Sequence, residues 1–438
     1  MNFDESLAYL LALGNEVSAM KLGLENIGKV LAALGNPEKN YLKVQIAGTN
    51  GKGSTCAFLE AICVDANIKV GLTTSPHLVS ITERIKIEGG EIGEKDFARQ
   101  ATLVREISER LVEKGELETV PTFFEQVTAI AVNYFAEQKI ELAILETGLG
   151  GRFDATTAAN AEIVGLTPID YDHQNILGET LTKIAAEKAA IIRQDTSVIA
   201  APQKREAENV IYGKCREVGV EPVWAIPNVK LIEDLGGGLL YLSFTTKKTN
   251  YKVDFWMQGK HQWTNATLAI HIAENLRDFN FKIPKESIEN GLETAEHKGR
   301  LEFWFNADAP SILFDGAHNV AGAKALKEYL DEFIKQPITM IFGAMKDKDL
   351  REIAEILFPK VEFLIFTKPD NPRSMETSEL MEFLPEKFDA QNVFQSETIE
   401  EALKTARKFS SDKNLICVTG SLYLVGEAQK LLAENKQQ

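Results

Sequence analysis

The sequence predicts an α/β protein of two domains, in which a larger domain with a parallel sheet precedes a smaller α/β domain. Three observations predict this class. Short apolar segments alternate with amphipathic helical segments, a glycine-rich turn at residues 48–55 connects an apolar strand to a helix, and the alternation starts again after about residue 302. The length of 438 residues fits two or three domains of about 150 residues each.

Apolar runs bounded by turn residues predict the strands of the first domain at Val44–Ala47, Leu142–Glu146, Ile163–Thr167 and Val198–Ala201. Amphipathic segments predict its helices at Lys52–Ala66, Glu94–Lys114, Phe123–Gln138, Thr180–Arg193, Lys204–Val218, 262–277 and 284–293. Residues 226–258 alternate around glycine and Lys-Thr-Asn turns, and they predict a small insertion of antiparallel hairpins. Because strands and helices otherwise alternate, the main sheet is expected to be parallel with helices on both faces.

The second domain repeats the alternation without a glycine loop of its own, which predicts a smaller Rossmann-like fold. Its expected strands are Ser311–Phe314, Thr339–Phe342, Phe363–Phe366 and Leu415–Thr419. Its expected helices are 320–334, 348–357, 376–383 and 398–409. The boundary is placed within His297-Lys298-Gly299-Arg300, which divides the chain into residues 1–298 and 299–438. A cleft between two such domains is where ligands are expected.

The composition excludes several classes of protein. The net charge of −16 has no compensating basic block, which argues against non-specific binding to nucleic acid or an anionic membrane. The four cysteines are scattered without metal-binding spacing, and no apolar run approaches the ~20 residues that span a bilayer. The first residues, Met-Asn-Phe-Asp-Glu-Ser, are acidic where a signal or transit peptide would be basic. We therefore expect a cytoplasmic protein with no membrane or nucleic-acid partner.

The glycine-rich turn predicts a phosphate-binding site. The sequence Gly48-Thr49-Asn50-Gly51-Lys52-Gly53-Ser54-Thr55 follows a buried strand and opens a helix. Glycines allow backbone N–H groups to face an anion, the helix dipole favours negative charge, and Lys52 can reach the outer phosphates of a nucleotide. The match to G-x-x-x-x-G-K-[ST] is imperfect, because Gly53 separates Lys52 from Ser54. The first domain is therefore predicted to be a P-loop ATPase domain.

Two strand ends supply candidate ligands for a divalent cation, which phosphoryl transfer requires. Glu146 ends the second predicted strand and precedes a glycine-rich run, and His173 follows the third strand. We place these two strand ends side by side and expect two magnesium ions. The alternatives are a strand-end carboxylate paired in a turn and a packed histidine.

Lys188 lies among alanines in the predicted helix 180–193 and leaves two interpretations open. It can be a solvated lysine, or it can be carbamylated, which would convert the cation into a carboxylate that ligates a metal. Four further candidate residues lie where the domains meet. Asn265 could recognise an adenine edge, Arg300 offers a positive fork for phosphates, and Asp315 with His318 follows the first strand of the second domain.

These motifs resemble the folylpolyglutamate synthases, many of which are also dihydrofolate synthases, within the Mur ligase superfamily of ATP-dependent amide-forming enzymes. The resemblance runs almost from end to end. It rests on residues 21–27, 48–55, 74–78, 83–85, 122–125, 146–154, 172–173, 187–188, 261–266, 299–302, 315–319, 346–349 and 419–421. Two departures from the family pattern are Thr157, where Asn is expected, and Lys298, where Pro is common.

The resemblance implies a role for each matching residue. It implies nucleotide contacts for Asn50, Gly51, Lys52, Gly53, Ser54, Asn265, Arg300 and Asp315, and magnesium ligands in Ser75, Glu146 and His173. It implies a carbamylated Lys188, a glutamate site at His318 and Ser421, and a pteroate or folate pocket beside Met20, Lys21, Leu22, Ser75, Pro76, His77, Leu78, Arg84 and Phe124. Lys52, Lys188 and His318 are the expected catalytic residues.

The activity that the resemblance implies is ATP-dependent addition of L-glutamate to folates, and also to dihydropteroate, through an acyl phosphate. The expected ligands are ATP, Mg²⁺, glutamate and a folate or dihydropteroate, and a monomer is expected. One alternative is a related ligase acting on a UDP-sugar peptide, which needs an N-terminal domain. Only ~40 residues precede the loop, fewer than the ~50 of a small domain. The other alternative is a nucleotide-dependent switch without chemistry.

Overall fold

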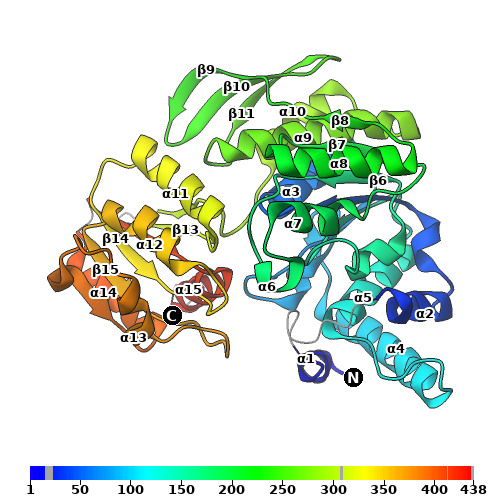
Figure 1. The fold of residues 1–438 in the computed structure, drawn as a ribbon, viewed down its shortest axis with the longest axis horizontal. Coiled ribbons are helices and arrows are strands. Elements are labelled where there is room, and N and C mark those ends of the chain that lie inside the picture. Colours follow the sequence, from blue (N-terminus) through cyan, green and yellow to red (C-terminus); the bar gives the residue numbers. More distant parts are fainter. Residues whose placement is uncertain (15–22, 306–308, 412, 436–438) are drawn as a thin grey trace.

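The computed structural model describes residues 1–14, 23–305, 309–411 and 413–435. The chain forms two lobes (Figure 1), of which the larger holds the elements up to α10 and the smaller holds those from β13 onward. The larger lobe contains an 8-stranded sheet and a 3-stranded sheet, and the smaller lobe contains a 6-stranded sheet.

The main sheet of the first lobe is predominantly parallel, in the order β4-β3-β2-β5-β1-β6-β7-β8. Strands β2, β5, β1, β6, β7 and β8 pair in parallel, and β3 and β4 add an antiparallel edge. The strands are β1 Leu42–Ala47, β2 Val70–Thr73, β3 Ile85–Ile87, β4 Gly90–Glu91, β5 Leu142–Glu146, β6 Ile163–Leu166, β7 Ser197–Ala200 and β8 Pro222–Trp224. Strand β1 therefore lies at the centre, and the loop that follows it opens at the carboxyl edge between β5 and β6.

Helices cover both faces of this sheet, because side chains of its strands alternate between two sides. Ile144 packs with α3, α9 and α10, whereas Leu145 packs with α1, α2, α4 and α5. A third apolar cluster joins α7 and α8 to β6 and β7. The helices are α1 Phe3–Ala12, α2 Glu25–Ala33, α3 Lys52–Asp65, α4 Glu94–Glu113, α5 Phe123–Glu137, α6 Gln174–Leu177, α7 Leu181–Ala189, α8 Arg205–Val218, α9 His261–Leu276 and α10 Lys285–Thr294.

The 3-stranded sheet is the antiparallel insertion that residues 226–258 predict. It has the order β11-β10-β9, and the strands are β9 Val229–Gly236, β10 Leu239–Thr245 and β11 Asn250–Phe255. Alternate side chains, including Phe244, Val253 and Phe255, join the apolar core with α3 and α9, while Leu231, Ile232 and Leu235 on β9 are exposed.

The second lobe has a sheet in the order β12-β13-β17-β14-β15-β16, parallel except for β12. Its elements are β12 Glu302–Trp304, β13 Ser311–Asp315, α11 Val320–Phe333, β14 Ile338–Phe342, α12 Leu350–Leu357, β15 Phe363–Phe366, α13 Thr377–Leu380, β16 Val393–Gln395, α14 Ile399–Phe409, β17 Leu415–Thr419 and α15 Leu422–Asn435. Apolar clusters cover both faces of the sheet, as expected of a doubly wound domain.

The fold class that the sequence predicts is confirmed, and the predicted strands agree with the structure within one or two residues. The predicted helix 180–193 is shorter, because it begins after the cap Thr180, which accepts a hydrogen bond from the Lys183 N–H, and ends at Ala189. Strands β2, β3, β4, β8, β12 and β16 were not predicted, and all of them except β2 have three residues or fewer, too few to show an alternation. The domain boundary at residues 298 and 299 stays a prediction.

Within the described ranges, no helix combines the length and apolar character needed to cross a membrane.

Candidate active site

The glycine-rich loop joins the central strand β1 to helix α3 in a backbone conformation that demands glycine. Gly51 has a φ of 87° and precedes the first residue of α3. A side chain at Gly48 would collide with Thr167, and one at Gly51 would collide with Asn265. In the structure the Lys52 ammonium donates to the carbonyls of Gly48 and Thr49 at 3.4 and 3.3 Å.

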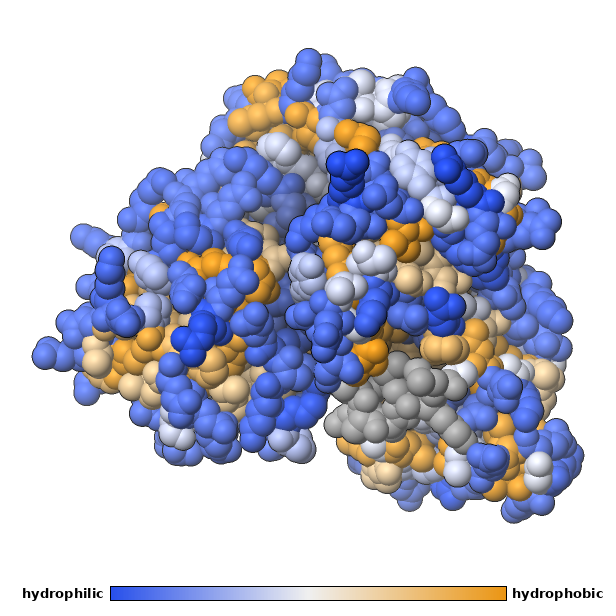
Figure 2. Space-filling view, in the orientation of Figure 1, coloured by the Kyte–Doolittle hydropathy of each residue, from blue (hydrophilic) through white to orange (hydrophobic). Residues whose placement is uncertain are grey.

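A cavity of about 340 Å³ lies over this loop and has walls from both domains. In the space-filling view of Figure 2 the surface is hollowed between the two lobes. The lining brings together every predicted nucleotide and metal residue, namely Asn50, Gly51, Lys52, Gly53, Ser54, Ser75, Glu146, His173, Asn265, Arg300 and Asp315, with Lys188 and His318. Residues that are far apart in the sequence thus converge on one loop.

Three side chains beside the loop have unused ligand atoms, as a divalent cation requires. The Glu146 carboxylate accepts the Ser75 N–H at 3.1 Å, while the buried Ser75 Oγ and His173 Nδ1 have no hydrogen-bond partner. Burial raises the pKa of Glu146, against the opposing effect of Lys52, and lowers the pKa of His173 to about 4, so this imidazole is neutral. Oxygen and neutral imidazole donors therefore fit Mg²⁺ here.

The arrangement of these donors corrects one expectation. Glu146 ends β5 and His173 follows β6, but β1 lies between these strands, so the two strand ends flank the loop instead of being adjacent. No three His, Cys, Asp or Glu side chains of the described residues form a complete metal site. Phosphate oxygens from a bound nucleotide would have to complete the coordination.

Lys188 is buried, which rules out the interpretation as a solvated lysine. Its side chain is 4% exposed, and its Nζ donates to the Gly48 carbonyl at 2.7 Å. Burial and the nearby Lys52 lower its pKa to about 7. A large fraction of this amine is therefore unprotonated at neutral pH, which is the form that reacts with carbon dioxide.

Arg300 and Asp315 bring the linker and the second domain to the cavity. The Asp315 carboxylate accepts the N–H groups of Leu301 and Ala317, both at 3.0 Å. Burial raises the pKa of Asp315 and lowers that of Arg300, and their opposite charges counteract both effects. The Arg300 guanidinium donates to the Gly316 carbonyl at 3.3 Å, so this cation is fixed where phosphates would lie.

Asp172 connects the two domains and was not singled out by the sequence. It accepts a hydrogen bond from Lys348 Nζ at 2.6 Å and one from Asn319 at 3.1 Å, and His318 Nε2 lies 3.6 Å away. Burial acts to raise its pKa, but His318, Lys348 and His173 outweigh that effect and hold the pKa far below the usual range. One carboxylate of the first domain thus organises three side chains of the second.

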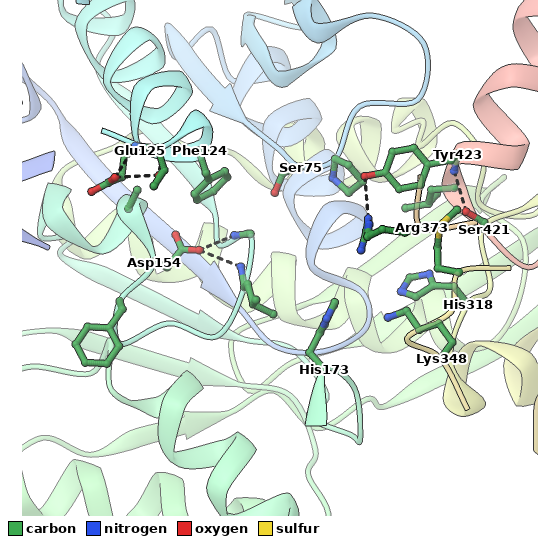
Figure 3. A pocket seen from close by; sticks show the side chains of 18 of the residues that line it. Ser75, Phe124, Glu125, Asp154, His173, His318, Lys348, Arg373, Ser421 and Tyr423 are labelled. Atoms are coloured by element: carbon green, nitrogen blue, oxygen red, sulfur yellow. Dashed lines mark hydrogen bonds between the residues drawn. The ribbon is translucent and has the colours of Figure 1, made fainter. Parts of the chain in front are cut away.

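A second cavity, of about 160 Å³, adjoins the first and has chemically different ends. Figure 3 shows Phe124, Glu125 and Asp154 on one side and five residues of the second domain on the other, with Ser75 and His173 between them. The second-domain residues are His318, Lys348, Arg373, Ser421 and Tyr423. One end therefore offers an aromatic ring and carboxylates, and the other offers cations and a hydroxyl.

The predicted substrate residues divide into three groups. Ser75, Pro76, Phe124, His318 and Ser421 line this cavity. His77 and Arg84 are not in its lining, because the Arg84 Nε donates to His77 Nδ1 at 2.7 Å and the guanidinium lies 5.3 Å from the Phe123 ring. Met20, Lys21 and Leu22 lie outside the described residues. Leu78 follows cis-Pro76 and packs against the second-domain core.

Arg373, Lys348 and Tyr423 of the second domain, like Glu125 and Asp154 of the first, line the cavity but were not individual candidates in the sequence analysis. Arg373 follows β15 in the run Asp-Asn-Pro-Arg, and an arginine after a strand end was the available signal. Its guanidinium lies 3.4 Å from the Tyr423 hydroxyl and 3.8 Å from the Asp347 carboxylate. A partly exposed guanidinium in a cavity is suited to a substrate carboxylate.

Comparison with protein families accounts for both domains. The sequence matches the Mur ligase middle domain over residues 46–273 and the Mur ligase, glutamate ligase domain over residues 299–422. The glycine loop and the aromatic end of the second cavity lie in the first match, and Lys348, Arg373 and Ser421 lie in the second. The site is therefore built between two Mur ligase domains.

Similarity to individual proteins shows which branch of the Mur ligase superfamily the chain resembles. The chain is 34% identical over 424 residues to the dihydrofolate synthase/folylpolyglutamate synthase of Bacillus subtilis, covering 94% of this chain and 95% of the relative. A structure of Mycobacterium tuberculosis folylpolyglutamate synthase complexed with ADP matches with a TM-score of 0.90 at 27% identity, covering 98% of this chain and 99% of that one. E. coli FolC in complex with DHPP and ADP matches with a TM-score of 0.86 at 26% identity, covering 100% and 99%. The chain belongs to the folylpolyglutamate synthase and dihydrofolate synthase family of ATP-dependent ligases within the Mur ligase superfamily.

Proposed function

We propose that this ligase joins L-glutamate to the carboxylate of a folate or of dihydropteroate at the expense of ATP. The observation that carries the proposal is that the two cavities share walls. Ser75, Gly148, His173 and His318 line both of them. A phosphate chain on the glycine loop and a carboxylate in the second cavity would therefore meet between Ser75 and His173.

The end with Phe124 and Asp154 suits a flat heterocycle with N–H donors. The Asp154 carboxylate is occupied within the chain, because one oxygen accepts the Gly148 and Leu149 N–H groups at 2.8 and 3.0 Å and the other accepts the Thr156 N–H and hydroxyl. One oxygen of the buried Glu125 carboxylate has no partner. An aromatic ring stacks on such a heterocycle, and the free Glu125 oxygen can accept one of its donors. The similarity to the dihydrofolate synthase/folylpolyglutamate synthase of Bacillus subtilis supports a pterin-containing substrate.

The opposite end suits the amino acid. Lys348 and Arg373 offer two cationic groups for the two carboxylates of glutamate, and Ser421 offers a hydroxyl. The incoming amine would then point toward Ser75 and His173, where the activated carboxyl group lies. His318 is placed at the junction of both cavities and is the candidate acceptor for the proton that the amine loses.

The proposed reaction has two steps. A carboxylate oxygen of the folate substrate attacks the γ-phosphorus of ATP and ADP leaves, which gives an acyl phosphate. The glutamate amine then attacks the acyl carbon, loses a proton, and releases phosphate as the amide forms. Lys52 and the loop N–H groups hold the phosphates in line, Arg300 neutralises their charge, and contact between the domains excludes water.

Mg²⁺, held by Ser75, Glu146 and His173, would supply charge neutralisation at the β- and γ-phosphates, and a carbamylated Lys188 would add a carboxylate for a second ion. The carbamylation proposal is supported by burial of Lys188 at the loop and by its pKa of about 7. A cytoplasmic location and a monomeric state stay predictions.

The test is a product assay with purified protein, ATP, Mg²⁺ and glutamate, with dihydropteroate and tetrahydrofolate in separate reactions. The expected result is a product heavier by one glutamyl residue in at least one reaction, with stoichiometric ADP. ATP-dependent change of shape without an amide product would favour the nucleotide switch instead.

A further inference from the structure

The linker between the domains contacts the phosphate loop through His297. The His297 Nδ1 lies 3.0 Å from the Ser54 Oγ, and the Gln262 side-chain amide donates to the same oxygen at 3.2 Å. The Asn265 amide donates in turn to the Gln262 carbonyl oxygen at 2.8 Å. A continuous row of hydrogen bonds therefore runs from the expected adenine contact, through the loop, to the linker.

The first two hydrogen bonds of this row have a defined direction. Asn265 donates to the Gln262 carbonyl oxygen, so the Gln262 amide donates to Ser54, and the tautomer of the His297 ring sets which partner donates in the third bond. Burial, and to a smaller extent Arg300, lowers the pKa of His297 to about 3, so the ring is neutral and has one acceptor nitrogen. Ser54, Gln262 and Asn265 are at most 3% exposed, so water has little access to replace a lost partner.

The imidazole ring also fits against the loop backbone. A side chain placed on Gly53 would have its Cβ 2.6 Å from His297 Cε1 and 2.8 Å from Nε2. Gly53 is the residue that interrupts the usual loop motif, and its missing side chain is what admits the ring. The extra glycine and the linker histidine are therefore complementary in shape.

The linker is held by the second domain immediately after His297. The Gly316 N–H donates to the Gly299 carbonyl at 2.9 Å, and Arg300 contacts the Gly316 carbonyl. Gly299 has a φ of 69°, so the chain turns between the contact of His297 with the phosphate loop and the contact of Arg300 with the second domain. Within four residues the chain is thus fixed first to the phosphate loop and then to the second domain.

We propose that His297 is a positioning residue that orients the Ser54 hydroxyl and attaches the linker to the phosphate loop, so that nucleotide binding and placement of the second domain are coupled. The proposal rests on the nucleotide-binding part of the proposed function. It does not require that the acyl substrate is a folate.

The test compares variants of the row. His297→Phe keeps a ring but removes the nitrogen that bonds to Ser54, His297→Asn keeps a polar atom near the Nδ1 position, and His271→Phe is the matched control. His271 lies on α9 with its ring nitrogen on the Thr267 carbonyl, away from the loop. Each variant is measured for ADP affinity by calorimetry and for KM of ATP and of glutamate.

A lost buried hydrogen bond predicts that His297→Phe weakens ADP binding and raises the KM of ATP about fivefold to tenfold. Because the linker also places the second domain, the KM of glutamate should rise as well, by a smaller factor. His297→Asn should recover most of the affinity, and His271→Phe should match the unmodified protein. In a double-mutant cycle with Ser54→Ala, the second substitution should add little to the first, since both break the same bond.

Two results would overturn the inference: ADP affinity of folded His297→Phe equal to that of the unmodified protein, or effects of Ser54→Ala and His297→Phe that add fully. The product assay distinguishes failure of the His297 inference from failure of the proposed ligase function. If no amide forms but the ADP affinities follow the predicted pattern, the positioning role stands and the ligase assignment falls.

Discussion

The two walls of the active site are held in place by different means. The wall of the first domain consists of a glycine loop whose conformation is set by its own backbone, and its neighbours are buried strand ends. The wall of the second domain consists of long side chains, and its Lys348 and His318 are oriented by Asp172 of the first domain. The nucleotide wall is therefore preformed, whereas the glutamate wall depends on contact between the domains.

The largest expected effect concerns the preformed wall. Lys52→Ala removes the cation that we propose binds the outer phosphates while leaving the loop backbone intact. Loss of one preorganised charge at a transferring phosphoryl group predicts a fall in kcat of about 10³-fold or more. Steady-state assays measure the loss, and circular dichroism with thermal melting checks the fold. Retention of turnover would contradict the account of the first wall, because the loop would then not hold the reacting phosphate.

Lys188 tests whether the preformed wall also carries a modification. Carbamylation consumes the unprotonated amine, and a pKa of about 7 in place of the ordinary 10.5 means that this form grows between pH 6 and 8. Mass spectrometry of the native protein should show addition of one carbon dioxide that increases with pH and bicarbonate. Lys188→Ala should lower activity about 10²-fold, on the scale of losing one metal-organising group, with partial recovery by short carboxylic acids.

The same pKa shift gives the sign of a stability effect. The folded chain binds fewer protons at Lys188 than the unfolded chain between pH 7 and 10.5, so the free energy of unfolding rises with pH across that window. Lys188→Met, which cannot be protonated, should flatten that rise. An unmodified lysine, no recovery by carboxylic acids and an unchanged pH profile would together contradict the prediction.

Asp172→Asn tests the dependence of the second wall on the first. The amide keeps the shape but removes the negative charge that pairs with Lys348 and faces His318. Breaking a buried ion pair predicts a fall of about 10- to 100-fold in kcat/KM for glutamate, with a smaller change in the KM of ATP. Asp331→Asn, which alters a surface ion pair with Lys327, is the matched control. Equal effects on ATP and glutamate would show that the walls are not organised separately.

The smallest effect is expected at Arg373, which lies at the far end of the second wall. Arg373→Lys keeps the charge but loses the planar pair of donors, and we expect the KM of glutamate to rise about fivefold to tenfold with kcat little changed. Arg407→Lys, on the exposed last turn of α14, is the control. A change in kcat without a change in KM would place Arg373 in the chemical step instead of in glutamate binding.

The contrast between the walls also explains what the sequence could predict. Strand β1, the glycine turn and the start of α3 are contiguous, so the strand–turn–helix arrangement behind the proposed phosphate site could be predicted from residues 44–58 alone. Glu146 and His173 were recognisable because each follows a buried strand. Their flanking positions around β1 were not, because the order of strands in a sheet depends on crossovers that no local pattern encodes.

The second wall was less predictable for the same physical reason. Asp172 and Lys348 are separated by 176 positions in the chain, and their contact follows from how the two domains pack. Arg373 lies in an irregular segment after β15, where neither helical nor strand periodicity applies. His297 appeared only as part of a linker, and its partner Ser54 is 243 positions away.

The most direct measurement of the central claim follows an oxygen atom. The folate or dihydropteroate substrate is labelled with ¹⁸O in its reacting carboxylate and incubated with ATP, Mg²⁺ and glutamate. If the γ-phosphate passes to this carboxylate where the two cavities meet, one labelled oxygen must appear in the released phosphate. Phosphate without label, formed together with the amide product, would contradict the account.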